Sequence, residues 1–157
     1  MLAGGTEQVA VMHILGNMVL TDSVLANKVV HNWSWEQVVN CVSRSTPGTT
    51  KEALWLIRGV TSHLSYEWLS LVLAVDLLDH VGDVICLPDP EIASWGLTIF
   101  HYWLRLGEMA ELLGFYNDNP VWLILENNGA LDKIEKLQME QNEVIHKLAI
   151  GILREHF

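Results

Sequence analysis

Apolar side chains recur at intervals of three and four residues along almost the whole chain. Two such sets are Trp35, Val38, Val39 and Val42, and Ile145, Leu148, Ala149 and Ile152. This spacing places the apolar residues on one face of an α-helix. Residues typical of turns interrupt the pattern at 45–50, 87–90, 116–120 and 127–129. No stretch alternates between apolar and polar residues as a half-buried strand does, so the sequence predicts an all-α protein.

The predicted helices repeat at a nearly fixed distance along the chain. Residues 11–16 match residues 53–58 at a shift of 42 positions, and further long helices begin near Asp89 and Gln141. A period of about 40–47 residues with two or three helices per unit is typical of armadillo and HEAT repeats. Such repeats stack into a solenoid with a concave binding surface. We therefore predict an armadillo-repeat α-solenoid, a right-handed superhelix of three-helix repeats.

The period divides this single solenoid domain into four parts. Residues 1–21 supply the last helix of a first repeat, residues 22–64 a second repeat, residues 65–116 a third and residues 117–157 a C-terminal capping repeat. Because the first repeat contributes one helix, part of its apolar face lacks its usual cover. Two explanations fit: the chain is cut from a longer protein, or a partner or a second copy covers that end.

Two of the long helices carry polar or aromatic residues beside their apolar stripes. On the first, His13 and Asn17 lie off the stripe of Val11, Ile14, Leu15, Met18 and Val19. On the second, Trp55 lies off the stripe of Ala53, Leu56, Ile57, Val60 and Leu64. A tryptophan outside the core stripe exposes apolar area, so either a neighbouring repeat or a binding partner is expected to cover it.

Six short segments share residues and spacing with one known family: residues 51–55 (Lys-Glu-Ala-Leu-Trp), 60–62 (Val-Thr-Ser), 104–108 (Leu-Arg-Leu-Gly-Glu), 129–138, 142–149 and 152–157. They resemble the C-terminal part of importin-α, the adaptor that carries nuclear localisation signals. The last three resemble the family's final armadillo repeat in both order and spacing. The resemblance covers essentially the whole chain. It implies the last helix of the seventh repeat followed by repeats eight, nine and ten.

The resemblance also implies a groove that holds a basic peptide. In the family, a Trp forms a slot for Lys or Arg, and an Asn four residues later bonds the peptide backbone. This chain keeps half of each pair, with His13 before Asn17 and Trp55 before Gly59. Because each lost backbone bond is worth about 1 kcal/mol, we expect weak or altered peptide binding.

Four further residues complete the predicted peptide-binding or cargo-binding site. Glu52 stands where a family carboxylate contacts the cargo lysine, and Arg58 follows Trp55 by three residues. On the next long helix, the positions equivalent to the Trp and Asn pair hold Thr98 and Tyr102.

Charge and composition narrow the classes of partner. Nine basic against nineteen acidic residues give a formal charge of −10, which repels nucleic acid and attracts basic partners. The longest apolar stretch, residues 69–78, is too short to span a bilayer. Two cysteines, Cys41 and Cys86, cannot form a disulfide framework, which fits a reducing compartment. We expect a protein cargo or a basic peptide as partner, neither nucleic acid nor membrane, and a location in the cytoplasm and nucleus.

The resemblance adds a nuclear export receptor as a partner of the C-terminal repeat, residues 129–157. Importin-β is not expected to bind, because no run of Lys and Arg resembles the segment through which the family binds it.

No motif predicts catalysis, a cofactor or a metal centre, so we expect the protein not to be an enzyme. Residues Asp76, Asp79, His80 and Asp83 share one helical face that could hold a divalent metal, but the solvated face of an amphipathic helix gives the same pattern. Six tryptophans besides Trp55 either fill the core or form an aromatic cargo surface: Trp33, Trp35, Trp68, Trp95, Trp103 and Trp122.

Two functions therefore compete. One is an adaptor of the importin-α type that recognises a cargo or a transport factor. The other is a repeat scaffold outside nuclear transport that binds one dedicated protein partner.

Overall fold

The computed structural model describes residues 5–32, 35–43 and 46–157, and within them every regular element is a helix. The helices are α1 (Gly5–Val19), α2 (Ser23–Asn32), α3 (Trp35–Ser43), α4 (Pro47–Thr61), the 3-10 helix η1 (Tyr66–Trp68), α5 (Leu69–Ala74), α6 (Leu77–Val84), α7 (Pro90–Leu112), α8 (Pro120–Asn127), α9 (Ala130–Leu137) and α10 (Glu143–His156). The prediction of an all-α protein is confirmed. In this described part of the chain, no helix is both long enough and apolar enough to span a bilayer.

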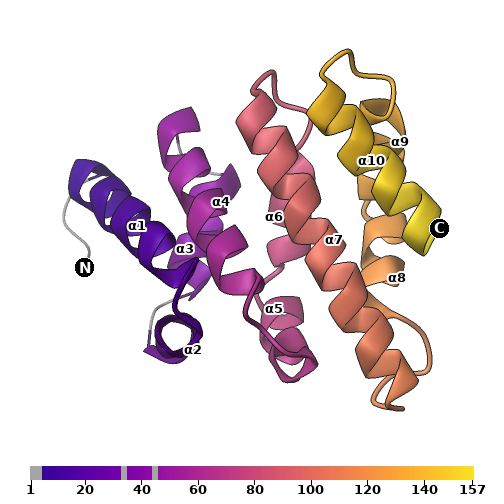
Figure 1. Ribbon diagram of the computed structural model, residues 1–157, viewed down its shortest axis with the longest axis horizontal. Helices are drawn as coiled ribbons and strands as arrows, with labels where there is room; N and C mark the ends of the chain where they lie inside the picture. Colours follow the sequence, from indigo (N-terminus) through magenta and orange to yellow (C-terminus); the bar gives the residue numbers. More distant parts are fainter. Residues whose placement is uncertain (1–4, 33–34, 44–45) are drawn as a thin grey trace.

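The long helices α1, α4, α7 and α10 lie side by side in one layer (Figure 1). Shorter helices lead from each long helix to the next; α3, α6 and α9 lie behind the layer, and α2 and α5 lie at its lower edge. Each long helix packs on its neighbour, α1 on α4, α4 on α7 and α7 on α10. Helices α1 and α10 lie at opposite ends of the row. The fold is therefore an extended stack in which contacts run between neighbouring groups of helices. The predicted boundaries between the repeats stay a prediction.

Three long helices begin at capping residues that the sequence supplies. The side chain of Thr46 accepts a hydrogen bond at the start of α4, Asp89 accepts two at the start of α7, and Asn142 accepts two at the start of α10. In α4 and α7 the next residue is a proline, Pro47 or Pro90. Proline suits the first helical position because the backbone N–H it lacks would have no partner there. These caps fix where the layer of long helices starts.

The tryptophans divide between the core and the half-buried surface. Trp103 on α7 is fully buried, as is Phe100 on the same helix. The other described tryptophans are half-buried: Trp35, Trp55, Trp68, Trp95 and Trp122. Trp33 lies outside the described residues. Among the tryptophans that the structure describes, Trp103 alone is fully buried in the core, and the others leave part of the side chain accessible to solvent.

The buried side of α1 differs from the predicted one. The structure buries Met12, Gly16 and Val19 where α1 packs on α4. Three residues of the predicted stripe are instead 39–56% exposed: Val11, Ile14 and Met18. The prediction was wrong for these three because it assumed a single apolar stripe, whereas α1 carries apolar residues on two sides and α4 covers one of them.

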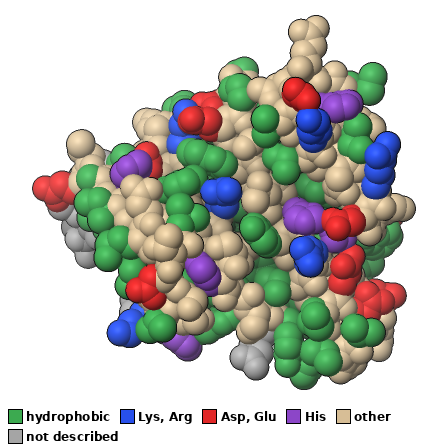
Figure 2. Space-filling model, in the orientation of Figure 1, with side chains coloured by type: hydrophobic (Ala, Val, Ile, Leu, Met, Phe, Trp, Pro, Cys, Tyr) green, Lys and Arg blue, Asp and Glu red, His purple; other side chains and the backbone are tan. Residues whose placement is uncertain are grey.

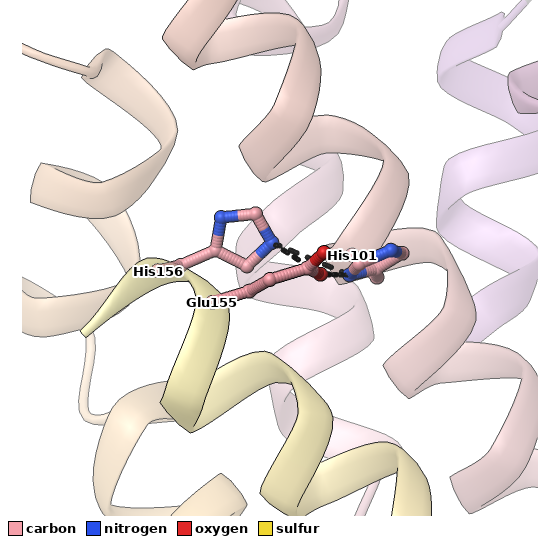
Figure 3. Close-up of side chains that lie close together, drawn as sticks. All are labelled: His101, Glu155 and His156. Carbon is pink, nitrogen blue, oxygen red and sulfur yellow. Dashed lines mark hydrogen bonds and ion pairs between the residues drawn. The ribbon is translucent and has the colours of Figure 1, made fainter.

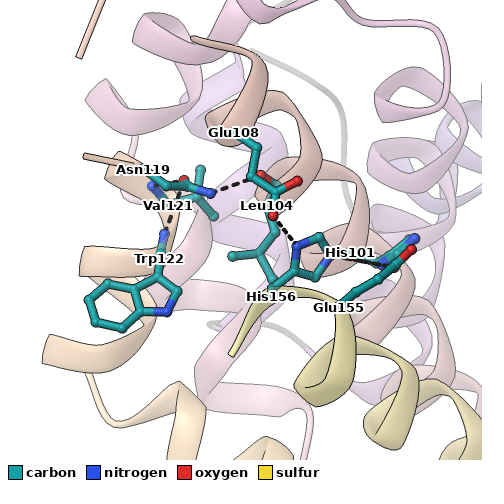
Figure 4. Close-up of polar contacts among 8 residues, drawn as sticks. All are labelled: His101, Leu104, Glu108, Asn119, Val121, Trp122, Glu155 and His156. Atoms are coloured by element: carbon teal, nitrogen blue, oxygen red, sulfur yellow. Dashed lines mark hydrogen bonds and ion pairs between the residues drawn. The ribbon is translucent and has the colours of Figure 1, made fainter. Parts of the chain in front are cut away.

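A buried asparagine attaches the C-terminal helices to α7 (Figure 4). Asn119 Nδ2 donates to the carbonyl oxygen of Leu104 at 2.9 Å, and its Oδ1 accepts from the amides of Val121 and Trp122 at the start of α8. This arrangement requires a glycine opposite. A Cβ at Gly107 would lie 1.9 Å from Asn119 Oδ1.

We therefore expect Gly107→Ala to destabilise the protein by about 1–3 kcal/mol, because the new methyl group must displace the Asn119 cap. Urea denaturation followed by circular dichroism measures the difference. Gly151→Ala is the matched control, since Gly151 is exposed on α10 and a Cβ added there would meet nothing within 4 Å. Its expected effect is a gain of about 0.5–1 kcal/mol from helix propensity. Equal effects of the two substitutions would contradict a tight contact at Gly107.

Candidate binding site on α1, α4 and α7

A chain of hydrogen bonds links the polar residues of α1 to those of α4. Trp55 Nε1 donates to Asn17 Oδ1 at 3.0 Å. Asn17 Nδ2 donates to His13 Nε2 at 3.2 Å, and His13 Nδ1 donates to Glu52 Oε2 at 2.8 Å. Each donor in this chain thus faces an acceptor. The two contacts of His13 are both satisfied when the imidazole carries its proton on Nδ1, because the Asn17 N–H can only donate and the Glu52 carboxylate can only accept. Four of the predicted site residues therefore form one connected network.

Two glycines allow α1 and α4 to come close enough for this network. A Cβ at Gly16 would lie 2.4 Å from Trp55 Cδ1, and a Cβ at Gly59 would lie 2.8 Å from Val19 Cγ2. Gly59 is buried against α1. It therefore presents no side chain to a peptide, and its role in the structure is to permit close helix packing.

The indole ring of Trp55 is partly covered by the protein's own side chains. The Arg58 guanidinium carbon lies 5.3 Å from the centroid of the ring, which is within the range of a cation–π contact. Trp95 of α7 packs on Trp55 with ring centroids 5.1 Å apart and planes tilted by 48°. Trp55 nevertheless remains half-buried rather than sealed, and Asn17 is exposed. The position where a basic side chain could stack is occupied in part by Arg58.

Thr98 and Tyr102 lie further along, on α7. The Thr98 hydroxyl donates to the carbonyl oxygen of Ser94 within the same helix at 2.8 Å. Tyr102 lines an open pocket between α7 and the end of α4, together with Leu64 and Met109 among others. In the described part of the chain, neither residue has a hydrogen bond or ring contact with the network around Trp55.

An ion pair ties the starts of α4 and α7 together beside this site. Lys51 Nζ lies 3.2 Å from Asp89 Oδ2 and 2.5 Å from Glu91 Oε2. Hydrogen bonds to Glu91 and Asp89 raise the pKa of Lys51 above its ordinary value. Burial by itself would raise the pKa of Asp89. The hydrogen bonds from Lys51 and from the backbone amides of Glu91 and Ile92 outweigh that effect, and the pKa of Asp89 lies below its ordinary value.

The face formed by the long helices mixes hydrophobic side chains with acidic, basic and histidine side chains (Figure 2). No broad field of one charge covers it in this view. Recognition of a ligand here would therefore depend on individual side chains rather than on a charged patch.

The structure thus brings together five of the eight predicted site residues: His13, Asn17, Glu52, Trp55 and Arg58. It buries Gly59 and places Thr98 and Tyr102 apart from the others. The roles of all eight in binding stay predictions. Sequence reasoning did not assign Trp95 to the site, although it lies 43 positions after Glu52, close to the period of the repeat.

The acidic face considered for a metal has other contacts. Asp79 accepts a hydrogen bond from Asn128 Nδ2 at 2.8 Å, and the His80 ring bonds to the hydroxyl of Ser43. These contacts connect α6 to α3 and to the turn before α9.

Comparison with known proteins agrees with this architecture. Residues 119–157 match the family model described as an atypical Arm repeat. Importin subunit alpha-1 of Caenorhabditis elegans is 25% identical over 143 residues, which are 91% of this chain and 27% of that protein. Importin subunit alpha-4 of Arabidopsis thaliana is 30% identical over 94 residues, which are 59% of this chain and 18% of that protein. The chain thus spans about a quarter or less of the length of these relatives.

Solved structures with the same fold include designed proteins. A designed armadillo repeat protein superposes with a TM-score of 0.79 at 16% identity, covering 97% of this chain and 59% of that one. Another, solved in complex with the peptide (KR)4, gives a TM-score of 0.61 at 17% identity, covering 97% of this chain and 76% of that one. The chain has the all-α armadillo-repeat fold, as predicted. Its sequence is similar to those of the importin alpha relatives at 25–30% identity.

We expect Asp89→Ala to lower the free energy of unfolding by about 0.5–2 kcal/mol at pH 7, because the substitution removes the cap of α7. The lowered pKa of Asp89 means that the folded state favours the carboxylate. Its contribution is therefore present above the ordinary value of 3.8 and is lost as the pH falls through the folded-state pKa.

The difference between the wild type and Asp89→Ala should thus shrink in acid, which urea denaturation at a series of pH values measures. Asp118→Ala, at an exposed loop position, should change stability by less than about 0.5 kcal/mol at pH 7. If Asp89→Ala lowers the free energy of unfolding by the same amount down to the lowest pH, the stabilising cap is not the ionised carboxylate.

Proposed function

We propose that this chain binds an extended basic peptide of a partner protein across α1, α4 and α7, and that it acts as an adaptor rather than as an enzyme. The observation that carries the proposal is the Trp55 and Asn17 pair, which two adjacent long helices hold in direct contact. The (KR)4 peptide in the complex of a designed armadillo protein supports this class of ligand. The names of the importin alpha relatives support a role in nuclear import, with action in the cytoplasm and nucleus.

Each group of the network can serve a basic peptide in a different way. The exposed part of the Trp55 ring can stack on the stem and cation of a Lys or Arg side chain. The Asn17 amide can bond the peptide backbone, and the Glu52 carboxylate supplies a negative charge nearby. The formal charge of −10 accelerates the encounter with a basic segment.

The same geometry predicts weak binding. A bound lysine must compete with Arg58 for the Trp55 ring, and the Asn17 amide keeps one N–H and one lone pair for the peptide after its bonds with His13 and Trp55. Gly59 has no side-chain amide that could form a further hydrogen bond with the peptide backbone. The binding free energy is therefore a small difference between bonds that form and bonds that break.

The second candidate is a scaffold that holds one dedicated protein partner. The contact of Trp95 with Trp55 favours it, because two half-buried indoles make a rigid aromatic surface suited to a folded protein. Under the adaptor proposal, the C-terminal repeat would also contact a nuclear export receptor. Affinity capture with the whole chain as bait separates the two candidates. Transport receptors and several basic cargoes support the adaptor, and one partner in fixed stoichiometry supports the scaffold.

A fluorescently labelled (Lys-Arg)4 peptide tests the site directly. We expect Trp55→Ala to weaken its binding about twofold to thirtyfold, since a cation–π contact is worth roughly 0.5–2 kcal/mol. Fluorescence anisotropy measures the dissociation constant. Trp122→Ala on α8 is the control for the loss of a half-buried indole, and it should leave the affinity unchanged. Binding that is equally tight with both variants would place the peptide elsewhere.

Removing the competing cation should have the opposite effect. We expect Arg58→Met to strengthen binding of the same peptide about twofold to tenfold, because the ring is freed and a like charge is removed while the apolar stem is kept. Arg154→Met on α10 changes the net charge equally at an exposed position and should have little effect. Weaker binding by Arg58→Met would mean that Arg58 itself contacts the peptide.

A further inference from the structure

Three potential metal ligands converge where the last turn of α10 packs on the middle of α7 (Figure 3). His101 belongs to α7, whereas Glu155 and His156 belong to α10. The distance from His101 Nδ1 to His156 Nε2 is 3.3 Å. Glu155 Oε2 lies 3.3 Å from His101 Nδ1 and 3.7 Å from His156 Nε2. The three side chains point toward one another from two helices that are far apart in the sequence.

These spacings fit a metal centre. Zinc holds His nitrogens and carboxylate oxygens at about 2.0–2.2 Å in a tetrahedral arrangement, which separates neighbouring ligand atoms by roughly 3.3–3.5 Å. The nitrogen–nitrogen separation of 3.3 Å, which also permits a weak hydrogen bond between the two rings, falls within this range. A small inward rotation of the Glu155 side chain, which is 58% exposed, would bring the third ligand to the same spacing.

A fourth side chain orients one of the rings. His156 Nδ1 donates to Glu108 Oε1 at 2.5 Å (Figure 4). This bond fixes the proton on Nδ1 and turns the lone pair of Nε2 toward His101. The His156 side chain is 2% exposed, so its orientation is set by packing as well as by Glu108. A carboxylate behind a histidine is the usual outer partner of a metal-binding imidazole.

We propose that His101 Nδ1, His156 Nε2 and Glu155 Oε2 bind one Zn²⁺ ion, with Glu108 positioning His156. Two imidazoles and one carboxylate are a ligand set that zinc accepts, whereas calcium and magnesium prefer oxygen alone. Water would take the fourth position, because Glu155 lies on the solvent-exposed side. The ion would join the final turn of α10 to α7 and so fasten the C-terminal repeat to the solenoid.

The test is a titration of the whole 157-residue chain with Zn²⁺ after treatment with a chelator, followed by isothermal titration calorimetry. We expect saturation at one ion per chain and a Tm that rises with zinc and falls again when the chelator is added. His101→Gln and Glu155→Gln should abolish or strongly weaken this binding. Both side chains are partly exposed, so these variants should keep the helical circular dichroism spectrum of the wild type.

Glu108→Gln distinguishes a positioning residue from a ligand. It should leave the stoichiometry at one ion and weaken the affinity about tenfold to a hundredfold. His31→Gln on α2 and Glu135→Gln on α9 are the matched controls, because both residues are exposed and lie outside the cluster, and both should bind as the wild type does.

Three results would overturn the proposal. The first is the absence of saturable binding. The second is binding that His101→Gln leaves intact, which would indicate adventitious sites only. The third is binding that depends on the exposed thiol of Cys86, shown by its loss in Cys86→Ser.

Discussion

The packing of one long helix on the next is the constraint on which the rest of the structure depends. Each repeat buries apolar side chains within itself and against its neighbours, so the distance between adjacent long helices decides which of their side chains can meet. Between α1 and α4 this distance is set by Gly16 and Gly59, each of which faces an atom of the opposite helix closer than a Cβ could tolerate. The hydrogen bond from Trp55 to Asn17 exists because the backbones approach this closely.

This close packing has a consequence for recognition. The polar groups of the candidate site already satisfy one another, and Arg58 already occupies part of the Trp55 ring. A site of this kind is rigid before a ligand arrives, which lowers the entropy lost on binding. A ligand binds there only if the interactions that it forms are more favourable than the interactions within the site that it replaces. The proposed ligand, an extended basic chain, offers backbone amides and cations at regular spacing to meet that condition.

The sequence predicted the helices and the repeat, because these depend on local spacing and on residue type, and the family resemblance pointed to the four residues of the hydrogen-bond network. It could not predict how side chains on different helices meet. Trp95 reaches Trp55 only because α7 packs on α4. The period alone makes Trp95 the position equivalent to Glu52 in the next repeat, and it does not predict a contact with Trp55. The meeting of His101 with His156 depends likewise on the packing of α10 on α7, across 55 residues of sequence.

The wrong prediction for the buried side of α1 has the same physical origin. A long helix inside a solenoid has two neighbours in its layer, so it needs apolar or shape-matched residues on two sides. In α7, Trp95 contacts α4 and His101 contacts α10. Six residues at about 100° per residue place these two side chains on different sides of the helix. When a helix with two apolar sides is assigned a single apolar stripe, the stripe is centred between the two sides and includes residues that neither neighbour covers. An interpretation that assigns one set of positions to each neighbour would place Met12, Gly16 and Val19 against α4 and leave Val11, Ile14 and Met18 for the opposite side, as the structure does.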